Sequence, residues 1–167
     1  MGRIEAATTD TGPLIHLSEL RKQVILSQLI RSILTTEEVM SELSPVQQQQ
    51  WKQYLTIRPL DGRSKDLSKF LIGQFELHLG EATAIALAKS EKIRLFLTDD
   101  LTARITAKHF GMVPHGTIGL LMRAFREGIF SKEEAIALLH ELRQTSLYLT
   151  SDLLQYAIRQ IERYGQR

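Results

Sequence analysis

Apolar and polar positions along the chain follow two alternating patterns. Short runs rich in apolar residues are typical of buried strands, and the clearest of them is the segment IRLFLT at residues 93–98. Longer stretches between these runs repeat their apolar residues every three or four positions, as on one face of a helix. Strands are expected at residues 6–9, 32–34, 93–98 and 112–114, and residues 56–60 are either a strand or an extended loop. This alternation predicts an α/β fold with a parallel central sheet flanked by helices.

Leucine spacing and capping residues place the helices. Thr35 and Glu38 have the three-residue spacing of a capping box, which predicts that a helix begins there. The segment DGRSKD predicts a polar turn, and Ser131 and Ser151 are the expected N-caps of the last two helices. Further helices are expected at residues 12–20, 24–30, 45–55, 67–79, 81–92, 101–110 and 116–128.

Composition narrows the class of protein. The chain has 167 residues, which favours a single domain, and its 43% apolar and 24% charged residues are ordinary for a globular protein. The sequence has no long apolar run that predicts a membrane span and no signal-peptide pattern at its N-terminus. Cysteine is absent, which excludes disulfides and cysteine-based zinc sites and is consistent with a cytoplasmic location. The net charge of +2 permits a nucleic-acid partner without favouring one.

Acidic residues recur where predicted strands end or helices begin. Asp10 follows the first strand, and Asp99 and Asp100 follow residues 93–98. Glu42 lies on the helix after the second strand, and Glu81 opens a helix directly after a glycine. Ligands of parallel sheets bind beyond the carboxyl ends of the strands, so these side chains are expected at one edge. Carboxylates brought together repel one another unless a divalent cation such as Mg²⁺ or Mn²⁺ lies among them, and such a cation can promote phosphodiester hydrolysis.

Each acidic residue also has a simpler interpretation. Asp10, Asp99 or Asp100 is explained equally well as a helix N-cap or turn residue, and the glutamates as ordinary helix residues. What favours a site is the recurrence of four acidic positions in order at the same edge. The histidines show no paired metal-ligand spacing, and no aromatic platform of the kind found in single-strand binders is visible.

Two other residues are candidates for substrate contacts. Arg104 lies about one turn after Asp100, on a helix that begins at the acidic edge, where it could face a phosphate. Thr117 opens the helix at residues 116–128, either as its cap, which is the simpler interpretation, or as a hydrogen-bond partner of a metal-bound water.

Five segments in order resemble the PIN-domain family, over roughly residues 6–130. These segments are TDTGPLIHL, EEVMSEL, LGEATAIALA, LFLTDDLTAR and GTIGLLMRA, and they are most similar to the branch of VapC-like toxin ribonucleases. The resemblance implies a Rossmann-like parallel sheet, an acidic cluster that binds Mg²⁺ or Mn²⁺, and cleavage of RNA. Residues 131–167 would then form a C-terminal helical extension of a single PIN-like nuclease domain over residues 1–167.

The resemblance also implies roles for individual residues. Asp10, Glu42, Glu81 and Asp100 match the family's acidic positions and would be the catalytic and metal-binding residues. Glu81 stands where the family usually has Asp, and Asp99 where many members have Asn, so Asp99 and Asp100 both remain candidates for the last ligand. Thr98 matches a Thr or Ser that helps to orient a metal-bound water.

The resemblance further implies partners and leaves alternatives open. Members of this branch are usually restrained by a small antitoxin protein, and a homodimer is expected. A lone member can instead serve RNA maturation. The main alternative is a non-catalytic PIN-fold module that binds nucleic acid or protein. A phosphatase that uses Asp10 as its nucleophile is a third hypothesis, but no second Asp follows at the spacing DxDxT.

Overall fold

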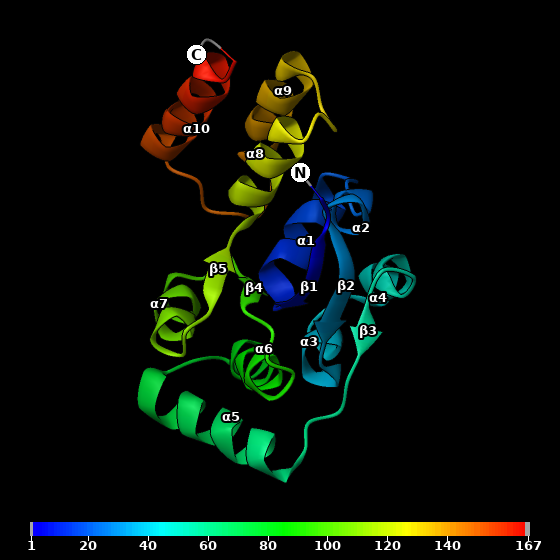
Figure 1. Ribbon diagram of the computed structural model, residues 1–167, viewed down its shortest axis with the longest axis vertical. Helices are drawn as coiled ribbons and strands as arrows, with labels where there is room; N and C mark the ends of the chain where they lie inside the picture. Colours follow the sequence, from blue (N-terminus) through cyan, green and yellow to red (C-terminus); the bar gives the residue numbers. More distant parts are fainter. Residues whose placement is uncertain (1, 166–167) are drawn as a thin grey trace.

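The centre of the computed structural model, which describes residues 2–165, is a sheet of five parallel strands in the order β3-β2-β1-β4-β5 (Figure 1). Ala7 in the central strand pairs with Ile33 on one side and with Leu95 on the other. The strands are β1 Ile4–Thr9, β2 Ile30–Thr35, β3 Thr56–Ile57, β4 Leu95–Leu97 and β5 Val113–His115. The predicted α/β class, with a parallel sheet flanked by helices, is confirmed.

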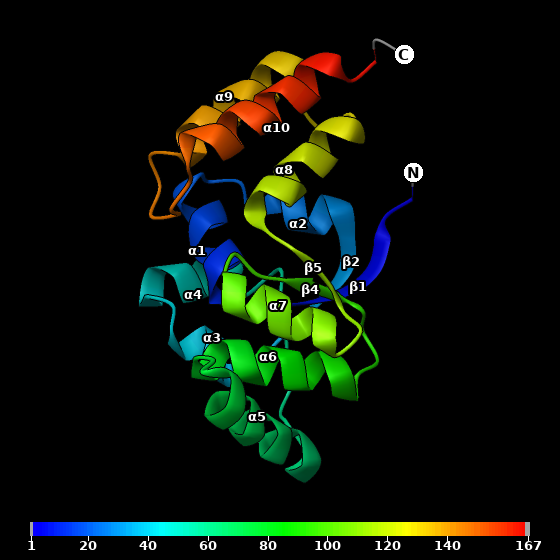
Figure 2. The same cartoon turned by 90° about the vertical axis from the view of Figure 1, so that its left-hand side faces the viewer.

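Helices cover both faces of this sheet (Figure 2). Helix α6 packs against β1 and β4 with α5 outside it, whereas α1, α2 and α8 lie on the other side. The alanines of α6 are fully buried, and their small side chains allow this helix to pack close to the strands. The helices are α1 Thr11–Glu19, α2 Val24–Leu29, α3 Glu37–Ser41, α4 Pro45–Trp51, α5 Gly62–Phe75, α6 Leu79–Ser90, α7 Leu101–His109, α8 Thr117–Arg126, α9 Lys132–Leu142 and α10 Ser151–Arg163.

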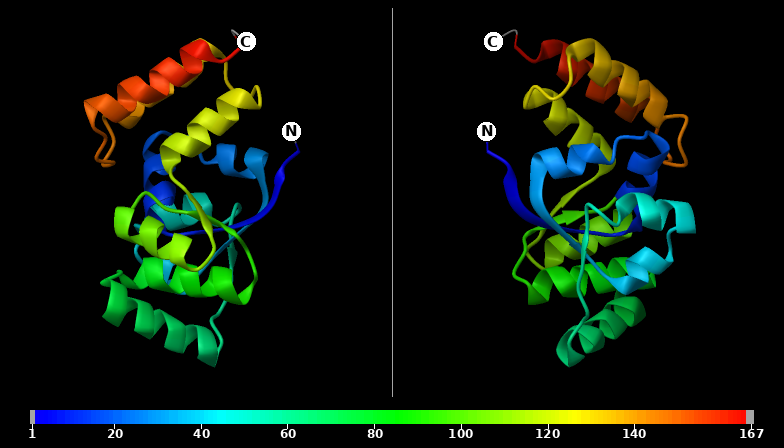
Figure 3. Two further views of the ribbon diagram at one scale, coloured as in Figure 1. Left: turned by 60° about the vertical axis from the view of Figure 1, so that its left-hand side comes forward. Right: turned by 90° about the vertical axis from the view of Figure 1, so that its right-hand side faces the viewer.

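The C-terminal helices belong to the same hydrophobic core as the rest of the chain. Figure 3 shows α9 and α10 side by side beyond α8. Leu139, Leu142 and Ile161 are at most 1% exposed. They belong to one continuous hydrophobic cluster that also contains the buried residues of the strands and of the helices that cover the sheet. Among residues 2–165, no helix is both long enough and apolar enough to cross a membrane.

Three local predictions were wrong. Strand β2 continues through Thr35, so the N-cap of α3 is Thr36, whose hydroxyl accepts a hydrogen bond from the Val39 amide at 3.2 Å. The N-cap of α10 is likewise Thr150 rather than Ser151. In both places two neighbouring hydroxyl residues could serve as the cap, and the backbone conformation selects one of them.

The third error concerns the segment DGRSKD, which is not a turn. The Asp61 carboxylate accepts a hydrogen bond from the Ser64 amide at 2.8 Å and caps α5, so the polar residues form its first turn. This helix ends at Phe75, because Glu76 takes the left-handed conformation with φ of 56°. The predicted helix at residues 67–79 therefore spans the end of α5, the connection and the first residue of α6.

Candidate active site

Four of the predicted acidic residues line one pocket at the carboxyl edge of the sheet. This acidic pocket has a volume of about 410 Å³, and its walls include Asp10, Glu42, Glu81 and Asp100. Asp10 follows β1, Glu42 ends α3, Glu81 lies in the first turn of α6 and Asp100 caps α7. The structure therefore brings together residues that lie up to 90 positions apart in the chain.

Asp10 is the most deeply buried of the four. It is 3% exposed, and its two carboxylate oxygens accept hydrogen bonds from the Thr98 hydroxyl at 2.5 Å and the Gly12 amide at 3.2 Å. Burial raises the pKa of Asp10 well above its usual value of 3.8, and the negative charges of Glu81 and Asp99 raise it further. A cation in the pocket would offset these effects, because it favours the charged form of the carboxyl group.

The neighbouring glutamates are held by local donors. Glu42 accepts hydrogen bonds from the Gly80 amide at 3.0 Å and from the Thr11 hydroxyl at 2.5 Å. Glu81 accepts one from the His78 amide at 2.9 Å. Burial raises the pKa of Glu81, and the charge of Asp100 raises it further. Glu81 is thus within electrostatic reach of both aspartates of the pocket.

The donor set fits a hard divalent cation, because carboxylate oxygens are the ligands that Mg²⁺ and Mn²⁺ prefer. Within residues 2–165, however, no group of three or more His, Asp or Glu side chains is placed closely enough to hold a metal ion as it stands. The local hydrogen bonds account for this spacing, since they hold each carboxylate toward its own backbone or hydroxyl donor. Three-carboxylate coordination would therefore require some of these side chains to rotate.

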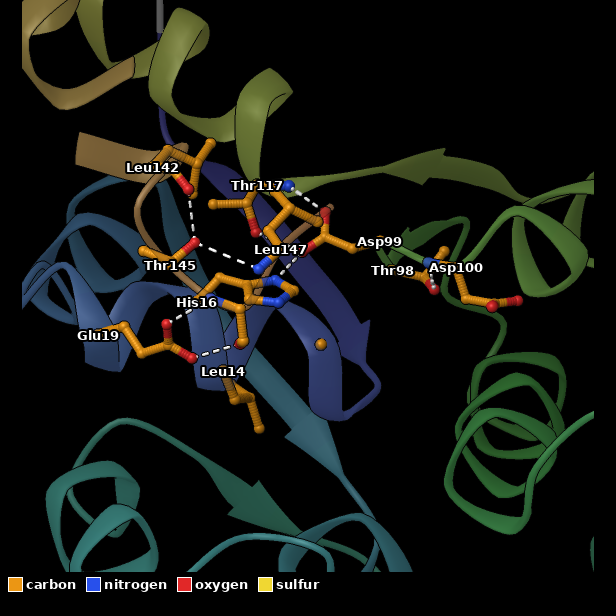
Figure 4. A network of polar contacts seen from close by, with 12 residues as sticks. Leu14, His16, Glu19, Thr98, Asp99, Asp100, Thr117, Leu142, Thr145 and Leu147 are labelled. Carbon is orange, nitrogen blue, oxygen red and sulfur yellow. Dashed lines mark hydrogen bonds and ion pairs between the residues drawn. The ribbon is translucent and has the colours of Figure 1, made fainter. Parts of the chain in front are cut away.

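Asp99 and Asp100 face different surroundings although they are neighbours in the chain. Figure 4 shows that their side chains point to opposite sides. Asp99 accepts hydrogen bonds from the Thr117 amide at 2.7 Å and hydroxyl at 2.6 Å, and its other contact is His16 Nδ1 at 2.6 Å from Asp99 Oδ2. Asp99 does not line the acidic pocket, whereas Asp100 does.

The two predicted substrate contacts also lie on the Asp99 side. Thr117 is fully buried, and the N-cap of α8 is Gly116, so the predicted capping role of Thr117 was wrong and its hydroxyl holds Asp99 instead. Arg104 lines a second cavity next to the acidic pocket. Its guanidinium donates to the Thr98 carbonyl at 3.4 Å.

Sequence reasoning missed His16 and Thr11. Both belong to α1, which begins directly after Asp10. This closeness in the chain could have indicated that their side chains lie near the acidic residues. His16 was set aside because it has no second histidine at metal-ligand spacing. Its partner is instead Asp99, 83 residues away, and since a carboxylate only accepts, the proton lies on His16 Nδ1.

Comparison with known proteins identifies one family. A family model described as "DUF3368: PIN domain" matches residues 6–163. The match continues through α9 and α10, beyond residue 130, where the resemblance had been expected to end. Searches among curated proteins and among solved structures found no match.

Proposed function

The chain belongs to the PIN-domain family, and from that premise we propose that it is a metal-dependent endoribonuclease that hydrolyses RNA phosphodiester bonds at the acidic pocket. The observation that carries this proposal is the meeting of four carboxyl groups from four separate segments in one pocket, with the buried Asp10 at its base. Burial raises the pKa of Asp10, and the neighbouring charges of Glu81 and Asp99 raise it further, so the arrangement is electrostatically unfavourable by itself and is typical of a cation site.

Asp10, Glu42, Glu81 and Asp100 are the proposed metal ligands, and Mg²⁺ or Mn²⁺ is the proposed ion. When bound, such an ion activates water and offsets the negative charge that develops on a phosphate under attack. Thr98 and the Gly12 amide orient Asp10, and Thr11 and the Gly80 amide orient Glu42. These four donors hold the two carboxylates at the pocket, and some of the acidic side chains would rotate for three of them to reach one ion.

Replacing Asp10 by Asn tests this proposal. We expect Asp10→Asn to lower the rate of RNA cleavage with Mn²⁺ or Mg²⁺ by at least about 100-fold, because the substitution removes a charged ligand and leaves the shape unchanged. Glu37→Gln is the matched control, since Glu37 is an exposed residue of α3 that does not line the pocket. Cleavage by Asp10→Asn at the rate of the unsubstituted protein would exclude Asp10 from the reaction.

The alternative function is a non-catalytic PIN-fold module that binds nucleic acid or protein. The observation that favours it is the spacing of the acidic side chains, no three of which are close enough in residues 2–165 to hold one ion. Titration calorimetry with Mn²⁺ separates the two functions. A heat of binding that disappears in Asp10→Asn supports the nuclease, and no heat at millimolar Mn²⁺ supports the module.

The toxin role is a further part of the proposal and rests on the sequence resemblance to VapC-like proteins. A small antitoxin would then restrain the enzyme, which we propose to be a homodimer. Induced expression in a bacterial host tests the toxin role, because a toxin stops growth while Asp10→Asn does not. Light scattering of the purified protein tests the dimer.

A further inference from the structure

A second cavity lies on the other side of the Asp99–Asp100 pair from the acidic pocket, and its walls are of a different kind. Its volume is about 500 Å³, and its walls are mainly apolar side chains, which include Leu101, Ile118 and Leu153. The two spaces lie on opposite sides of the junction between β4 and α7 (Figure 4), because Asp99 and Leu101 line the second cavity and Asp100 between them lines the acidic pocket. Because Asp99 and Asp100 are consecutive residues, an RNA strand with one phosphodiester group at the acidic pocket can place a neighbouring nucleotide at the second cavity.

The loop between α9 and α10 forms one wall of the second cavity and is fixed by hydrogen bonds. The Glu19 carboxylate, at the end of α1, accepts hydrogen bonds from the Ser146 amide at 2.7 Å and from the Ser146 hydroxyl. The Thr145 hydroxyl donates to the Leu142 carbonyl at 2.6 Å and accepts from the Leu147 amide at 3.3 Å (Figure 4). Contacts within the chain thus anchor this wall, which lowers the entropic cost of binding.

Tyr148 and Arg104 give this cavity its chemistry. The Tyr148 side chain is 89% exposed although its loop is anchored, so the ring is open to a ligand. No acidic side chain in the described part of the chain forms an ion pair with Arg104, whose single hydrogen bond is a long one to the Thr98 carbonyl. The cavity thus combines a flat aromatic ring, apolar walls and a guanidinium that forms no ion pair within residues 2–165. The Asp99 carboxylate in the same wall is held by His16 and Thr117.

Arg104 is the cation that lines this cavity, and Arg126 lies on the same side of the molecule. Arg123 nearby is already paired with Glu127 at 2.9 Å. Burial lowers the pKa of His115, which lines the cavity, and the positive charges of Arg123, Arg104 and Arg126 lower it further. These arginines therefore lie within electrostatic reach of the cavity wall. The fork of donors on a guanidinium matches the geometry of phosphate as well as of carboxylate, and aromatic rings stack on unpaired bases, so an RNA nucleotide fits both features of the cavity.

We infer that this second cavity binds an unpaired nucleotide of the RNA, with its base against Tyr148 and the apolar walls and its phosphate at Arg104. The inference builds on the proposed function, since it places the nucleotide next to the phosphodiester group that occupies the acidic pocket. It assigns a role to the C-terminal segment, which supplies Leu147, Tyr148 and Leu153 to the cavity. It also makes single-stranded RNA the preferred substrate, because a paired base cannot enter.

Binding of RNA without metal tests this inference separately from cleavage. The probe is a fluorescent single-stranded RNA of about ten nucleotides in buffer with EDTA, measured by anisotropy with the full chain. We expect Tyr148→Ala to weaken binding at least about fivefold, which is the lower end of the effect of losing one base–aromatic stack. Tyr148→Phe keeps the ring and should bind within about twofold of the unsubstituted protein.

Tyr156→Ala is the matched control, because Tyr156 is a half-exposed tyrosine of α10 that does not line the cavity. We expect it to leave binding unchanged, and a blunt RNA duplex should bind equally to all variants. In cleavage assays, Tyr148→Ala should raise KM and leave kcat within about twofold, because Tyr148 holds the substrate and lies outside the acidic pocket.

The outcomes separate this inference from the proposed function. If the protein cleaves RNA in an Asp10-dependent manner but Tyr148→Ala binds single strands normally, the cavity has another occupant, such as a peptide, and the inference is overturned. Alternatively, Tyr148→Ala weakens binding of single-stranded RNA alone while Asp10→Asn cleaves RNA at the rate of the unsubstituted protein. In that case the nucleotide site stands and the ribonuclease proposal fails. An equal loss of affinity of Tyr148→Ala for the duplex and for the single strand also overturns the inference.

Discussion

Gly80 and Glu42 show how a single residue can decide the geometry of the acidic pocket. A β-carbon at position 80 would lie 2.6 Å from Glu42 Oε1, closer than atoms can approach. The absent side chain lets the Glu42 carboxylate lie against the first turn of α6 and accept the Gly80 amide hydrogen bond. Glycine is therefore needed here for a close approach, although a glycine within a helix costs stability.

Replacing Gly80 by Ala should separate activity from stability. The added methyl group displaces the flexible Glu42 side chain, so we expect Mn²⁺ affinity and RNA cleavage to fall about 10–100-fold, as on loss of a residue that orients a ligand. Thermal stability should stay the same or rise, because Ala favours helices. Gly73→Ala is the control, since nothing lies within 4 Å of its added β-carbon. Full activity of Gly80→Ala would show that Glu42 is not needed at its present position.

Asp10 should make stability depend on pH in the absence of metal. Because burial raises its pKa, the folded chain keeps a proton that the unfolded chain releases. The resulting stabilisation is complete below about 3.8, the pKa of an unfolded Asp, and is lost as the pH rises through the raised folded pKa. In EDTA, Asp10→Asn should therefore melt at a higher temperature than the unsubstituted protein at about pH 8, and the difference should shrink toward about pH 4. A difference that is independent of pH would contradict this prediction.

At the scale of elements, α10 begins at a cap that the sequence left ambiguous. The Thr150 hydroxyl accepts a hydrogen bond from the Leu153 amide at 3.3 Å, whereas the Ser151 hydroxyl accepts one from Arg143. Helix α10 also follows the loop that carries Tyr148, so its start helps to fix one wall of the second cavity. The cap thus links the stability of one helix to the shape of the second cavity.

Paired substitutions at this cap should differ in their effect. We expect Thr150→Ala to lower the free energy of unfolding by about 0.5–2 kcal/mol, the usual cost of losing an N-cap. Ser151→Ala should change it by less than about 0.5 kcal/mol, because its exposed hydrogen bond is replaced by water. Urea unfolding of both variants measures the difference. A larger effect at Ser151 would place the cap one residue later.

At the scale of the whole molecule, α9 and α10 complete the core and do not form an appendage. Buried leucines of α9 and isoleucines of α10 pack together and against α8, which in turn packs on α1 and α2. Removal of both helices would expose several side chains that each contribute about 1.5–3 kcal/mol when buried. Their sum is comparable with the whole stability of a typical domain, which is about 5–15 kcal/mol.

A chain that ends at residue 130 should therefore fail to fold cooperatively. We expect it to show no sharp thermal transition by circular dichroism, because the face of α8 that packs on α9 is left bare. In the full chain, Leu139→Ala should cost about 2–5 kcal/mol, and the neighbouring exposed His140→Ala less than about 0.5 kcal/mol. A cooperative transition of the shortened chain would show that residues 131–167 are dispensable for folding.

The sequence by itself determined the succession of strands and helices along the chain, except at residues 56–60, where it allowed either a strand or a loop, and it placed acidic residues at the carboxyl edge. Hydrophobic periodicity predicts elements because it reflects contacts between residues that are close in the chain. The edge could be predicted because the carboxyl ends of parallel strands meet on one side of a sheet. Asp10 and Asp100 were therefore located from chain order, and both line the acidic pocket.

Only the tertiary structure decided which side chains share a space. Chain order does not show that Asp99 turns to His16 and Thr117 while Asp100 turns to the acidic pocket. Nor does it show that Gly80 makes room for Glu42. These relations join segments 18 to 83 residues apart, and they depend on the packing of whole helices against the sheet, which local sequence patterns do not encode.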